Sequence, residues 1–263
     1  MINMLLAHPA LGDYDLSSLR SLSYGAAPMA PARIVEAWER FGPILSQGYG
    51  GSEMTSGVAR LSISDHAHAI AHCPQRLASC GRPHVETDVR VVDESGQEVS
   101  GDQIGEVVVS GDDVFKGYWD APDLTAEVLI NGWFHTGDLA RVDDEGFIYL
   151  VDRKKDMIIS GGFNVYPTEV ETVMYQHPAI YEVSVIGVPD ARWGESVKAV
   201  ACLRPGATVT AEDLVAFCRE RMADYKCPRT VDFMPDLPKN ASGKVARKVV
   251  RERYWAGNER RIN

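Results

Sequence analysis

The order of hydrophobic and polar positions predicts a parallel α/β arrangement over the first fifty residues. Residues 19–24 are a short strand candidate, and extended structure is expected again at residues 43–45. Between them, apolar side chains recur at the spacing of one helix face, at Ile34, Ala37, Trp38 and Phe41. Because a strand, a helix and another strand follow one another, we expect the two strands to lie parallel in one sheet.

Between residues 86 and 151 the pattern changes to short β-rich runs. The runs are residues 89–92, 106–110, 139–142 and 147–151, and polar turn residues at 93–96 and 143–146 lie between them. Short runs joined by tight turns are typical of hairpins. We therefore expect an antiparallel, barrel-like piece after the α/β piece.

A cluster of charged residues at 152–156 marks the end of the β-rich part. Beyond it, Pro167 with acidic neighbours is typical of a helix start, and Thr210 is typical of another. Strands are expected at residues 183–188, 197–203 and 231–234, and a basic helix at 245–254. The sequence therefore predicts an α/β plus α+β fold in two domains, residues 1–153 and residues 154–263.

The composition is that of a packed, acidic protein. Hydrophobic residues make up 45% of the 263 residues, which excludes a disordered chain. The formal net charge is -10, so nucleic acid is not an expected partner. The five cysteines include no Cys-x-x-Cys pair and are expected to be reduced thiols. The start does not resemble a signal peptide, and no apolar stretch approaches the ~20 residues of a membrane span, so we expect a cytoplasmic protein.

A glycine-rich segment, residues 47–53, follows the second predicted strand. An ordinary turn would explain the glycines, and a dinucleotide-binding fingerprint would need glycine where Glu53 stands. A phosphate-binding role fits better. Glycine lets the backbone approach a nucleotide, Tyr49 offers a ring for stacking, Ser52 can donate to a phosphate, and Glu53 can bind Mg²⁺ through a hard oxygen.

Three further segments have a possible chemical role, and each also has an ordinary structural explanation. In residues 133–138, a turn beside buried aromatic residues is about as good an explanation as function, but Asp138 could accept both hydroxyls of a ribose. Residues 152–171 combine a charge run, an apolar hairpin and a proline-started helix, a combination that chance rarely supplies. Lys244 stands in a predicted loop, where a lone lysine is usually a solvent-exposed charge.

His66, His68, His72 and Cys73 could suggest a metal site. No tight second cluster of ligands supports that interpretation. We therefore expect these four to be surface residues of a loop or helix.

Together these segments resemble the adenylate-forming superfamily of acyl- and aryl-CoA synthetases, peptide-synthetase adenylation domains and beetle luciferases. Residues 25–28 resemble its Gly-Ala-Pro turn, and residues 49–53 its Tyr-Gly-x-Thr-Glu motif, with serine in place of threonine. Residues 133–138 match Trp-x-x-Thr-Gly-Asp, residues 153–171 match the hinge motif, and Lys244 is the lysine of the Ser-Gly-Lys loop. The motifs follow the family order over essentially the whole chain, which indicates the C-terminal part of an acyl-CoA synthetase.

The resemblance implies a role for each matching polar residue. Asp138 would hold the ribose hydroxyls, Arg153 would help to hold the nucleotide, and Ser52 would contact the α-phosphate. Glu53 would bind Mg²⁺. Lys244 would bridge the substrate carboxylate and the α-phosphate during in-line attack.

The resemblance also implies a hinge for the small domain and residues that line the binding pockets. Lys155 is identified as the hinge about which the small domain rotates between two half-reactions. Gly161 and Gly162 would line the pantetheine tunnel, where a side chain would obstruct the thiol. The other residues implied at the nucleotide and acyl pocket are Gly25, Ala26, Ala27, Gly48, Tyr49 and Gly50.

The implied activity is that of an AMP-forming acid–thiol ligase. A carboxylic acid, expected to be fatty or otherwise hydrophobic, reacts with ATP to an acyl-adenylate and pyrophosphate, and the CoA thiol then displaces AMP. The cofactors implied are ATP, Mg²⁺ and coenzyme A. The remaining partner expected is either the rest of the large domain or a second copy of the chain.

One family element has no counterpart in residues 1–263: the Ser/Thr/Gly-rich loop ending in Pro-Lys-Gly, which grips the outer phosphates. We therefore expect the isolated chain to be inactive. The alternative is a non-catalytic fragment that binds nucleotide or a partner protein. Finding the loop encoded just upstream would favour the ligase over this alternative.

Overall fold

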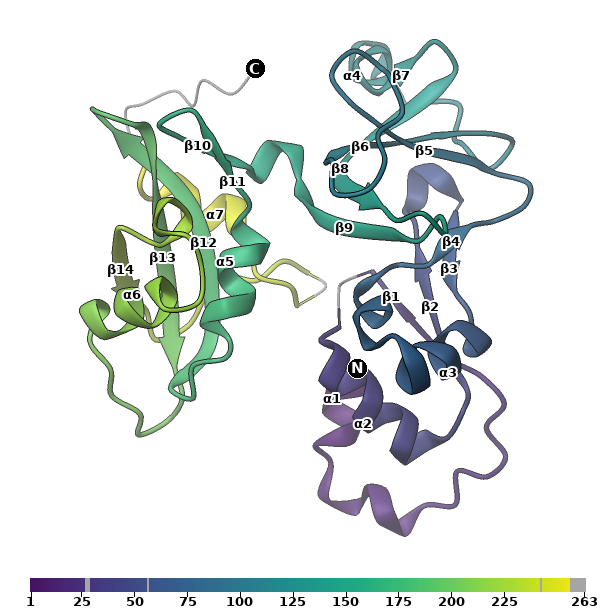
Figure 1. The fold of residues 1–263 in the computed structure, drawn as a ribbon, viewed down its shortest axis with the longest axis horizontal. Coiled ribbons are helices and arrows are strands. Elements are labelled where there is room, and N and C mark those ends of the chain that lie inside the picture. The colour runs from purple at the N-terminus through teal and green to yellow at the C-terminus, as the bar shows by residue number, and fades with distance from the viewer. Residues whose placement is uncertain (27–28, 56, 242, 256–263) are drawn as a thin grey trace. The chain divides into compact units, whose positions relative to one another are not determined.

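The computed structural model describes residues 1–26, 29–55, 57–241 and 243–255. The chain folds into two units, Met1–Leu150 and Val151–Asn263 (Figure 1). The first unit ends at Leu150, three residues before the predicted domain boundary after Arg153. The assignment of the two ranges to a large and a small domain stays a prediction. Within the described ranges, no helix is both long enough and apolar enough to cross a membrane.

The first unit begins with an α/β layer. Its elements are α1 (Ile2–Leu6), η1 (Pro9–Asp13), β1 (Leu22–Gly25), α2 (Pro31–Phe41), β2 (Leu45–Tyr49), η2 (Ser52–Met54), β3 (Ala59–Leu61), α3 (Ile63–His72), η3 (Pro74–Ala78) and β4 (Arg82–Pro83). The strands form one sheet in the order β1-β2-β3-β4. Leu22 pairs with Leu45 in parallel register, which confirms the predicted pairing, while β3 and β4 are antiparallel.

The helix α2 forms where the apolar spacing predicts it. Pro31 stands in its first turn and pre-sets the backbone for a helix. Ile34 and Ala37 are fully buried, and they pack in one cluster with Leu45 of β2. Gly42, with a φ of 85°, ends the helix in a conformation that favours glycine. The cluster fixes α2 against the β1–β2 pair.

An antiparallel sheet completes the first unit. It contains β5 (Asp88–Val92), β6 (Gly105–Ser110), β7 (Leu129–Ile130) and β8 (Trp133–Val142), with α4 (Pro122–Val128) before β7. A last strand, β9 (Ile148–Arg153), begins in the first unit and ends in the second. The order is β5-β6-β8-β7, and β9 also pairs with β8. The predicted antiparallel arrangement is confirmed. Tyr49 and Ala59 of the first sheet share one buried cluster with Val107 and Phe134 of the second, so the two sheets have a common core.

The second unit is the predicted α+β fold. Its elements are η4 (Lys154–Asp156), β10 (Ile158–Ser160), β11 (Phe163–Val165), α5 (Pro167–Met174), β12 (Ile180–Asp190), β13 (Gly194–Leu203), α6 (Ala211–Arg219), η5 (Asp224–Lys226), β14 (Thr230–Phe233) and α7 (Arg247–Glu252). The sheet order is β11-β10-β13-β12, and β14 pairs with β13 in parallel.

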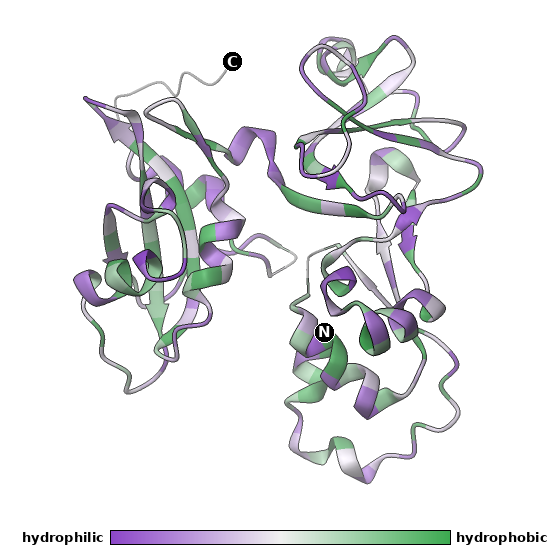
Figure 2. Ribbon diagram, viewed as in Figure 1, coloured by the Kyte–Doolittle hydropathy of each residue, from purple (hydrophilic) through white to green (hydrophobic). Residues whose placement is uncertain are grey.

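The β12–β13 pair forms the centre of the second unit because both of its faces are covered. Val185 and Ala199 pack in a cluster that includes α5 and α6 residues. Ile186 and Val200 point to the other face and pack with Val250 of α7. Figure 2 shows the hydrophobic residues along both strands. A strand buried on both faces is rich in apolar residues, and both strands contain such a segment, interrupted by Ser184 in β12 and by Lys198 in β13.

Candidate active site

Two of the predicted glycines meet where β1 pairs with β2. Gly25 pairs with Gly48, and a Cβ on Gly25 would lie 2.5 Å from the Gly48 carbonyl oxygen, so position 25 requires glycine. A Cβ on Gly48 would meet no atom within 4 Å. The backbone at Gly48 therefore leaves open space beside it, as a ligand-facing strand end requires.

The chain turns sharply after β1. Ala26 has a φ of 61°, in the left-handed region that costs a non-glycine residue on the order of 1 kcal/mol. Ala27 and Pro28, which also belong to the predicted turn motif, lie outside the described residues. At the matching end of β2, Gly50 is partly exposed.

A β-bulge in β8 carries the predicted ribose-binding carboxylate. His135 of β8 pairs with Val108 of β6, and Leu139 pairs with Glu106. Residues 136–138 therefore face the single residue 107, and the extra residues bulge out of the ladder. Residues 133–138 thus lie within a bulged strand and do not form the turn that was the ordinary explanation of this motif.

Contacts to both its backbone and its side chain hold Asp138. The Asp138 N–H donates to Thr136 Oγ1 at 3.0 Å, and the Thr136 hydroxyl donates to the Val107 carbonyl at 2.8 Å. The Tyr49 hydroxyl donates to Asp138 Oδ2 at 2.8 Å. Burial of Tyr49 and the nearby Asp138 charge raise the phenol pKa, so it remains a proton donor. Tyr49 is only 7% exposed, which leaves little ring face for the predicted stacking.

Glu53 stands in η2, directly after the glycine segment. The Phe115 N–H donates to the Glu53 carbonyl at 2.8 Å, and the Tyr118 hydroxyl donates to Glu53 Oε1 at 3.1 Å. These contacts fix both the backbone and the side chain. Ser52 is exposed beside it. Tyr118 was not predicted from the sequence. The aromatic pair Tyr118-Trp119, which follows Gly117, was the available signal.

The donor set at Glu53 fits Mg²⁺ that arrives with phosphates. No group of three or more His, Cys, Asp or Glu side chains in the described part of the chain could hold a metal ion. Mg²⁺ is commonly bound through one or two carboxylates together with substrate phosphates. One carboxylate, held by Tyr118, is compatible with Mg²⁺ that is also bound by nucleotide phosphates.

In the second unit, the predicted glycine pair forms the turn of the β10–β11 hairpin. Gly161 and Gly162 have φ values of 59° and 85°, as a two-residue hairpin turn with both residues left-handed requires. A Cβ on Gly161 would also lie 2.5 Å from the Trp193 ring. The turn and Trp193 therefore explain both glycines without a ligand, and their role in a pantetheine tunnel stays a prediction.

Beside the predicted hinge lies a partly buried ionic cluster that the sequence did not lead us to predict. Arg247 Nη1 lies 3.1 Å from Asp152 Oδ1 and 3.2 Å from Asp156 Oδ2, and Nη2 lies 2.8 Å from Glu171 Oε2. Burial opposes the charge of Arg247, but the three carboxylates more than compensate and raise its pKa. Arg153, Lys154 and Lys155, by contrast, are exposed. The sequence held two signals, the acidic residues of the charge cluster at 152–156 and a pair of arginines four residues apart, Arg247 and Arg251.

The predicted lysine loop is a closed turn. The Asn240 N–H donates to the Lys244 carbonyl at 2.8 Å, and the Lys244 N–H donates to Asn240 Oδ1 at 3.0 Å. Lys239 and Val245 form a β-bridge that closes the turn. Ser242 lies outside the described residues. The turn presents the exposed Lys244 side chain at a defined place in the second unit.

The predicted surface position of His66 is wrong. His66 is fully buried in α3, where its ring stacks on Trp38. Its Nδ1–H donates to the Ser62 carbonyl at 2.7 Å, so Nε2 accepts from the Tyr24 hydroxyl at 2.8 Å. A neutral histidine with both nitrogens engaged is a structural core residue. His68 and His72 are exposed on the same helix.

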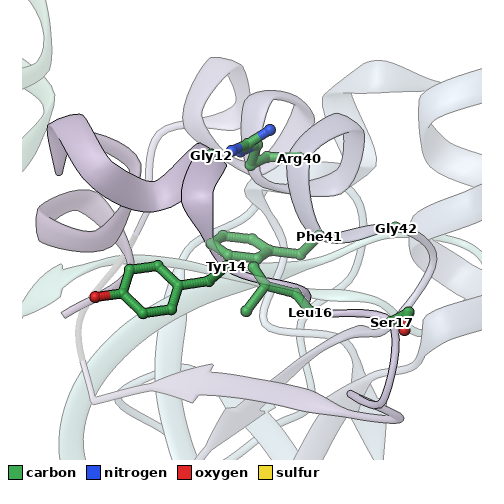
Figure 3. Close-up of a pocket in the computed structure, with 7 residues that line it drawn as sticks. All are labelled: Gly12, Tyr14, Leu16, Ser17, Arg40, Phe41 and Gly42. Atoms are coloured by element: carbon green, nitrogen blue, oxygen red, sulfur yellow. The ribbon is translucent and has the colours of Figure 1, made fainter.

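A hollow of about 340 Å³ lies near the N-terminus of the first unit (Figure 3). It is lined by Gly12, Tyr14, Leu16, Ser17, Arg40, Phe41 and Gly42. None of the predicted site residues lines this hollow, and we assign it no part in the candidate site.

Two families match consecutive parts of the chain. The AMP-binding enzyme family matches residues 1–119, and the AMP-binding enzyme C-terminal domain matches residues 169–244. The chain is also 44% identical over 270 residues to a medium/long-chain-fatty-acid–CoA ligase, FadD8, of Mycobacterium tuberculosis. That match covers 100% of this chain and 46% of that protein.

Solved structures agree with these matches. The amide bond synthetase McbA from Marinactinospora thermotolerans has a TM-score of 0.85 at 38% identity, over 96% of this chain and 50% of that one. An o-succinylbenzoate CoA synthetase, MenE from Bacillus subtilis, in complex with an acyl-adenylate intermediate, has a TM-score of 0.82 at 34% identity, over 94% and 49%. The chain spans about half the length of the curated relatives it matches. The order of the two family matches and the agreement in fold show that the chain belongs to the adenylate-forming AMP-binding enzymes and corresponds to the C-terminal part of these relatives.

Proposed function

We propose that this chain supplies the nucleotide-binding carboxylates, the hinge and the catalytic lysine of an acyl-CoA synthetase. In the proposed reaction a carboxylic acid attacks the α-phosphate of ATP, pyrophosphate leaves, and the thiol of coenzyme A then displaces AMP from the acyl-adenylate. The observation that carries the proposal is the contact between Tyr49 and Asp138.

This contact joins two motifs that are 89 residues apart in the chain. Tyr49 ends β2 of the first sheet, whereas Asp138 lies in the bulge of β8 in the second sheet. The glycine segment that follows Tyr49 is thus held at the same place as Asp138. An ionised carboxylate has about four lone-pair sites, so Asp138 can accept ribose hydroxyls in addition to the Tyr49 hydroxyl.

The remaining residues take roles around the α-phosphate. Ser52 donates to a phosphate oxygen, and Glu53, oriented by Tyr118, supplies the carboxylate for Mg²⁺. Bound Mg²⁺ offsets negative charge on the phosphates. Lys244 places its ammonium group between the attacking carboxylate and the α-phosphate, where charge builds in the transition state.

The second unit carries the parts proposed for the change between half-reactions. Arg153 helps to hold the nucleotide, and Lys155 is the hinge. Gly161 and Gly162 lie beside the path of the CoA thiol. The names of the relatives support a medium- or long-chain fatty acid as the acid and CoA as the acceptor. Because McbA is an amide bond synthetase, transfer of the acyl group to an amine is the alternative to transfer to CoA.

A chimera tests the proposal. Residues 1–263 replace the matching part of FadD8, and pyrophosphate release is followed with fatty acids, ATP and Mg²⁺, with CoA or an amine as the acceptor. We expect acid-dependent release, thioester formation with CoA, and an ATP KM about tenfold higher for Asp138→Asn. Unchanged kinetics in Asp138→Asn would contradict the proposed site.

The unfused chain is the matching control. We expect no useful turnover from it because residues 1–263 contain no Pro-Lys-Gly loop for the outer phosphates. Robust turnover by the unfused chain would show that the phosphates bind elsewhere in these residues.

A further inference from the structure

The bulge in β8 leaves backbone groups that the β-ladder cannot pair. Thr136 serves two of them, since its hydroxyl donates to the Val107 carbonyl and accepts from the Asp138 N–H. The third group is the N–H of Gly137, which donates to Glu106 Oε1 at 3.1 Å. Each of these three groups therefore has a partner, and a side chain provides that partner in every case.

Glu106 stands in an otherwise apolar part of β6. Its neighbours in the strand, residues 107–109, are buried valines. The Glu106 side chain is 13% exposed, and its second oxygen, Oε2, lies 3.4 Å from His135 Nδ1. Placing a carboxylate in such surroundings costs free energy unless it is hydrogen-bonded. Oε1 therefore contacts the bulge that carries Asp138, and Oε2 lies near His135, the residue just before the bulge.

The hydrogen bond between the Gly137 N–H and Glu106 fixes the backbone just before Asp138. Gly137 has a φ of 71°, a conformation that turns the chain immediately before Asp138. The Gly137 N–H belongs to the Thr136–Gly137 peptide, so the hydrogen bond to Glu106 fixes the plane of that peptide and the Cα of Gly137, from which the chain turns into Asp138. Glu106 therefore holds Asp138 through the backbone, while Tyr49 holds its carboxylate directly.

We propose that Glu106 is a positioning residue of the nucleotide site: through the Gly137 N–H it places the Asp138 carboxylate and thereby sets the preference for a nucleotide with ribose hydroxyls. This inference rests on the role proposed for Asp138 above. The hydrogen bond requires an acceptor at Glu106 and does not require its charge. A glutamine at this position can accept the same N–H, whereas an apolar side chain cannot.

Nucleotide binding to the 263-residue chain tests the proposal. AMP and 2′,3′-dideoxy-AMP are titrated in parallel into wild type, Glu106→Met and Glu106→Gln, and Glu106→Ala is used if the methionine variant does not fold. Glu94→Ala, in the exposed turn after β5, is the matched control. We expect wild type, Glu94→Ala and Glu106→Gln to prefer AMP, and Glu106→Met to bind AMP about tenfold more weakly with the preference lost.

Hydrogen exchange at the Gly137 amide supplies a readout that does not depend on nucleotide affinity. We expect exchange at Gly137 to be at least about tenfold faster in Glu106→Met than in wild type and to return to the wild-type rate in Glu106→Gln. Unchanged exchange and unchanged preference in Glu106→Met would overturn the inference, as would a loss of preference in Glu106→Gln. Equal affinity of wild type for the two nucleotides would instead overturn the role of Asp138, while the exchange rates still decide whether Glu106 holds the bulge.

Discussion

Arg247 and Asp152 form an ion pair within the second unit although the predicted hinge, Lys155, lies between them in the chain. Arg247 Nη1 and Asp152 Oδ1 are 3.1 Å apart, and Asp152 Oδ2 also accepts the Thr168 N–H at 2.7 Å. A rotation of the backbone at Lys155 alone would separate Asp152 from both partners. Either these contacts break during the rotation, or the pivot lies before Asp152.

The first prediction concerns stability. Arg247→Met removes the cation and leaves three carboxylates without it, so we expect the second unit to lose about 3–5 kcal/mol of unfolding free energy. Hydrogen exchange of the β12 and β13 amides measures this loss in the unit concerned. Lys248→Met, on the exposed side of the same helix, is the control and should change the unfolding free energy by less than about 0.5 kcal/mol. Equal effects of the two variants would show that the cluster contributes no net stability.

The second prediction locates the pivot. In the chimera with FadD8, Lys155→Pro fixes φ at the proposed hinge, so we expect adenylation to continue and thioester formation to be blocked. Lys155→Ala keeps the backbone freedom and should support both steps. If Lys155→Pro supports both steps as well, the rotation does not occur at Lys155, and a pivot before Asp152 would then keep the Arg247–Asp152 pair within one rigid body.

The third prediction is a pH dependence of the first unit. Burial lowers the pKa of His66 from its ordinary value of 6.5. Below that pH the unfolded chain binds a proton at His66 and the folded chain does not, so the unfolding free energy falls as the pH decreases. The slope contributed by this one group is at most ~1.4 kcal/mol per pH unit.

Denaturant unfolding between pH 7 and pH 5.5 measures this slope. His66→Gln should flatten it relative to wild type, because the titrating group is removed. His68→Gln, at an exposed position of the same helix, should leave the slope unchanged. A wild-type slope that persists in His66→Gln would assign the pH dependence to other groups.

Elements governed by local rules were predictable from the sequence. Thr210 and Asp213 form the capping box at the start of α6, where the spacing of these residues predicted a helix N-terminus. Pro167 starts α5 for the same kind of reason. The Gly161-Gly162 turn also follows from chain-local chemistry, since glycine adopts the left-handed conformation that both positions of this turn require without steric cost.

Contacts made through register and tertiary packing were not predictable in this way. Glu106 and Gly137 are 31 residues apart, and their contact exists because the bulge changes the register between β6 and β8. Arg247 and Asp152 are 95 residues apart. His66 was expected at the surface because nothing in α3 itself shows that Trp38 covers it. An isolated charged residue in an apolar strand, as at Glu106, was the available signal.

The last prediction concerns Lys244. In the chimera, Lys244→Ala should slow adenylation on the order of 10²–10³-fold, because the ammonium group is proposed to stabilise charge that builds at the α-phosphate in that step alone. The turn closed by Asn240 should persist, since its hydrogen bonds to Lys244 use backbone atoms of residue 244. Supplying pre-formed acyl-adenylate and CoA bypasses the first step and should restore thioester formation to near the unmodified rate. Lys239→Ala, in the same turn, is the matched control for loss of a lysine and should leave adenylation unchanged, because Lys239 pairs with Glu182 and has no proposed role at the α-phosphate. Equal damage to both half-reactions in Lys244→Ala would mean that the lysine acts in binding or folding and is not specific to the adenylation step.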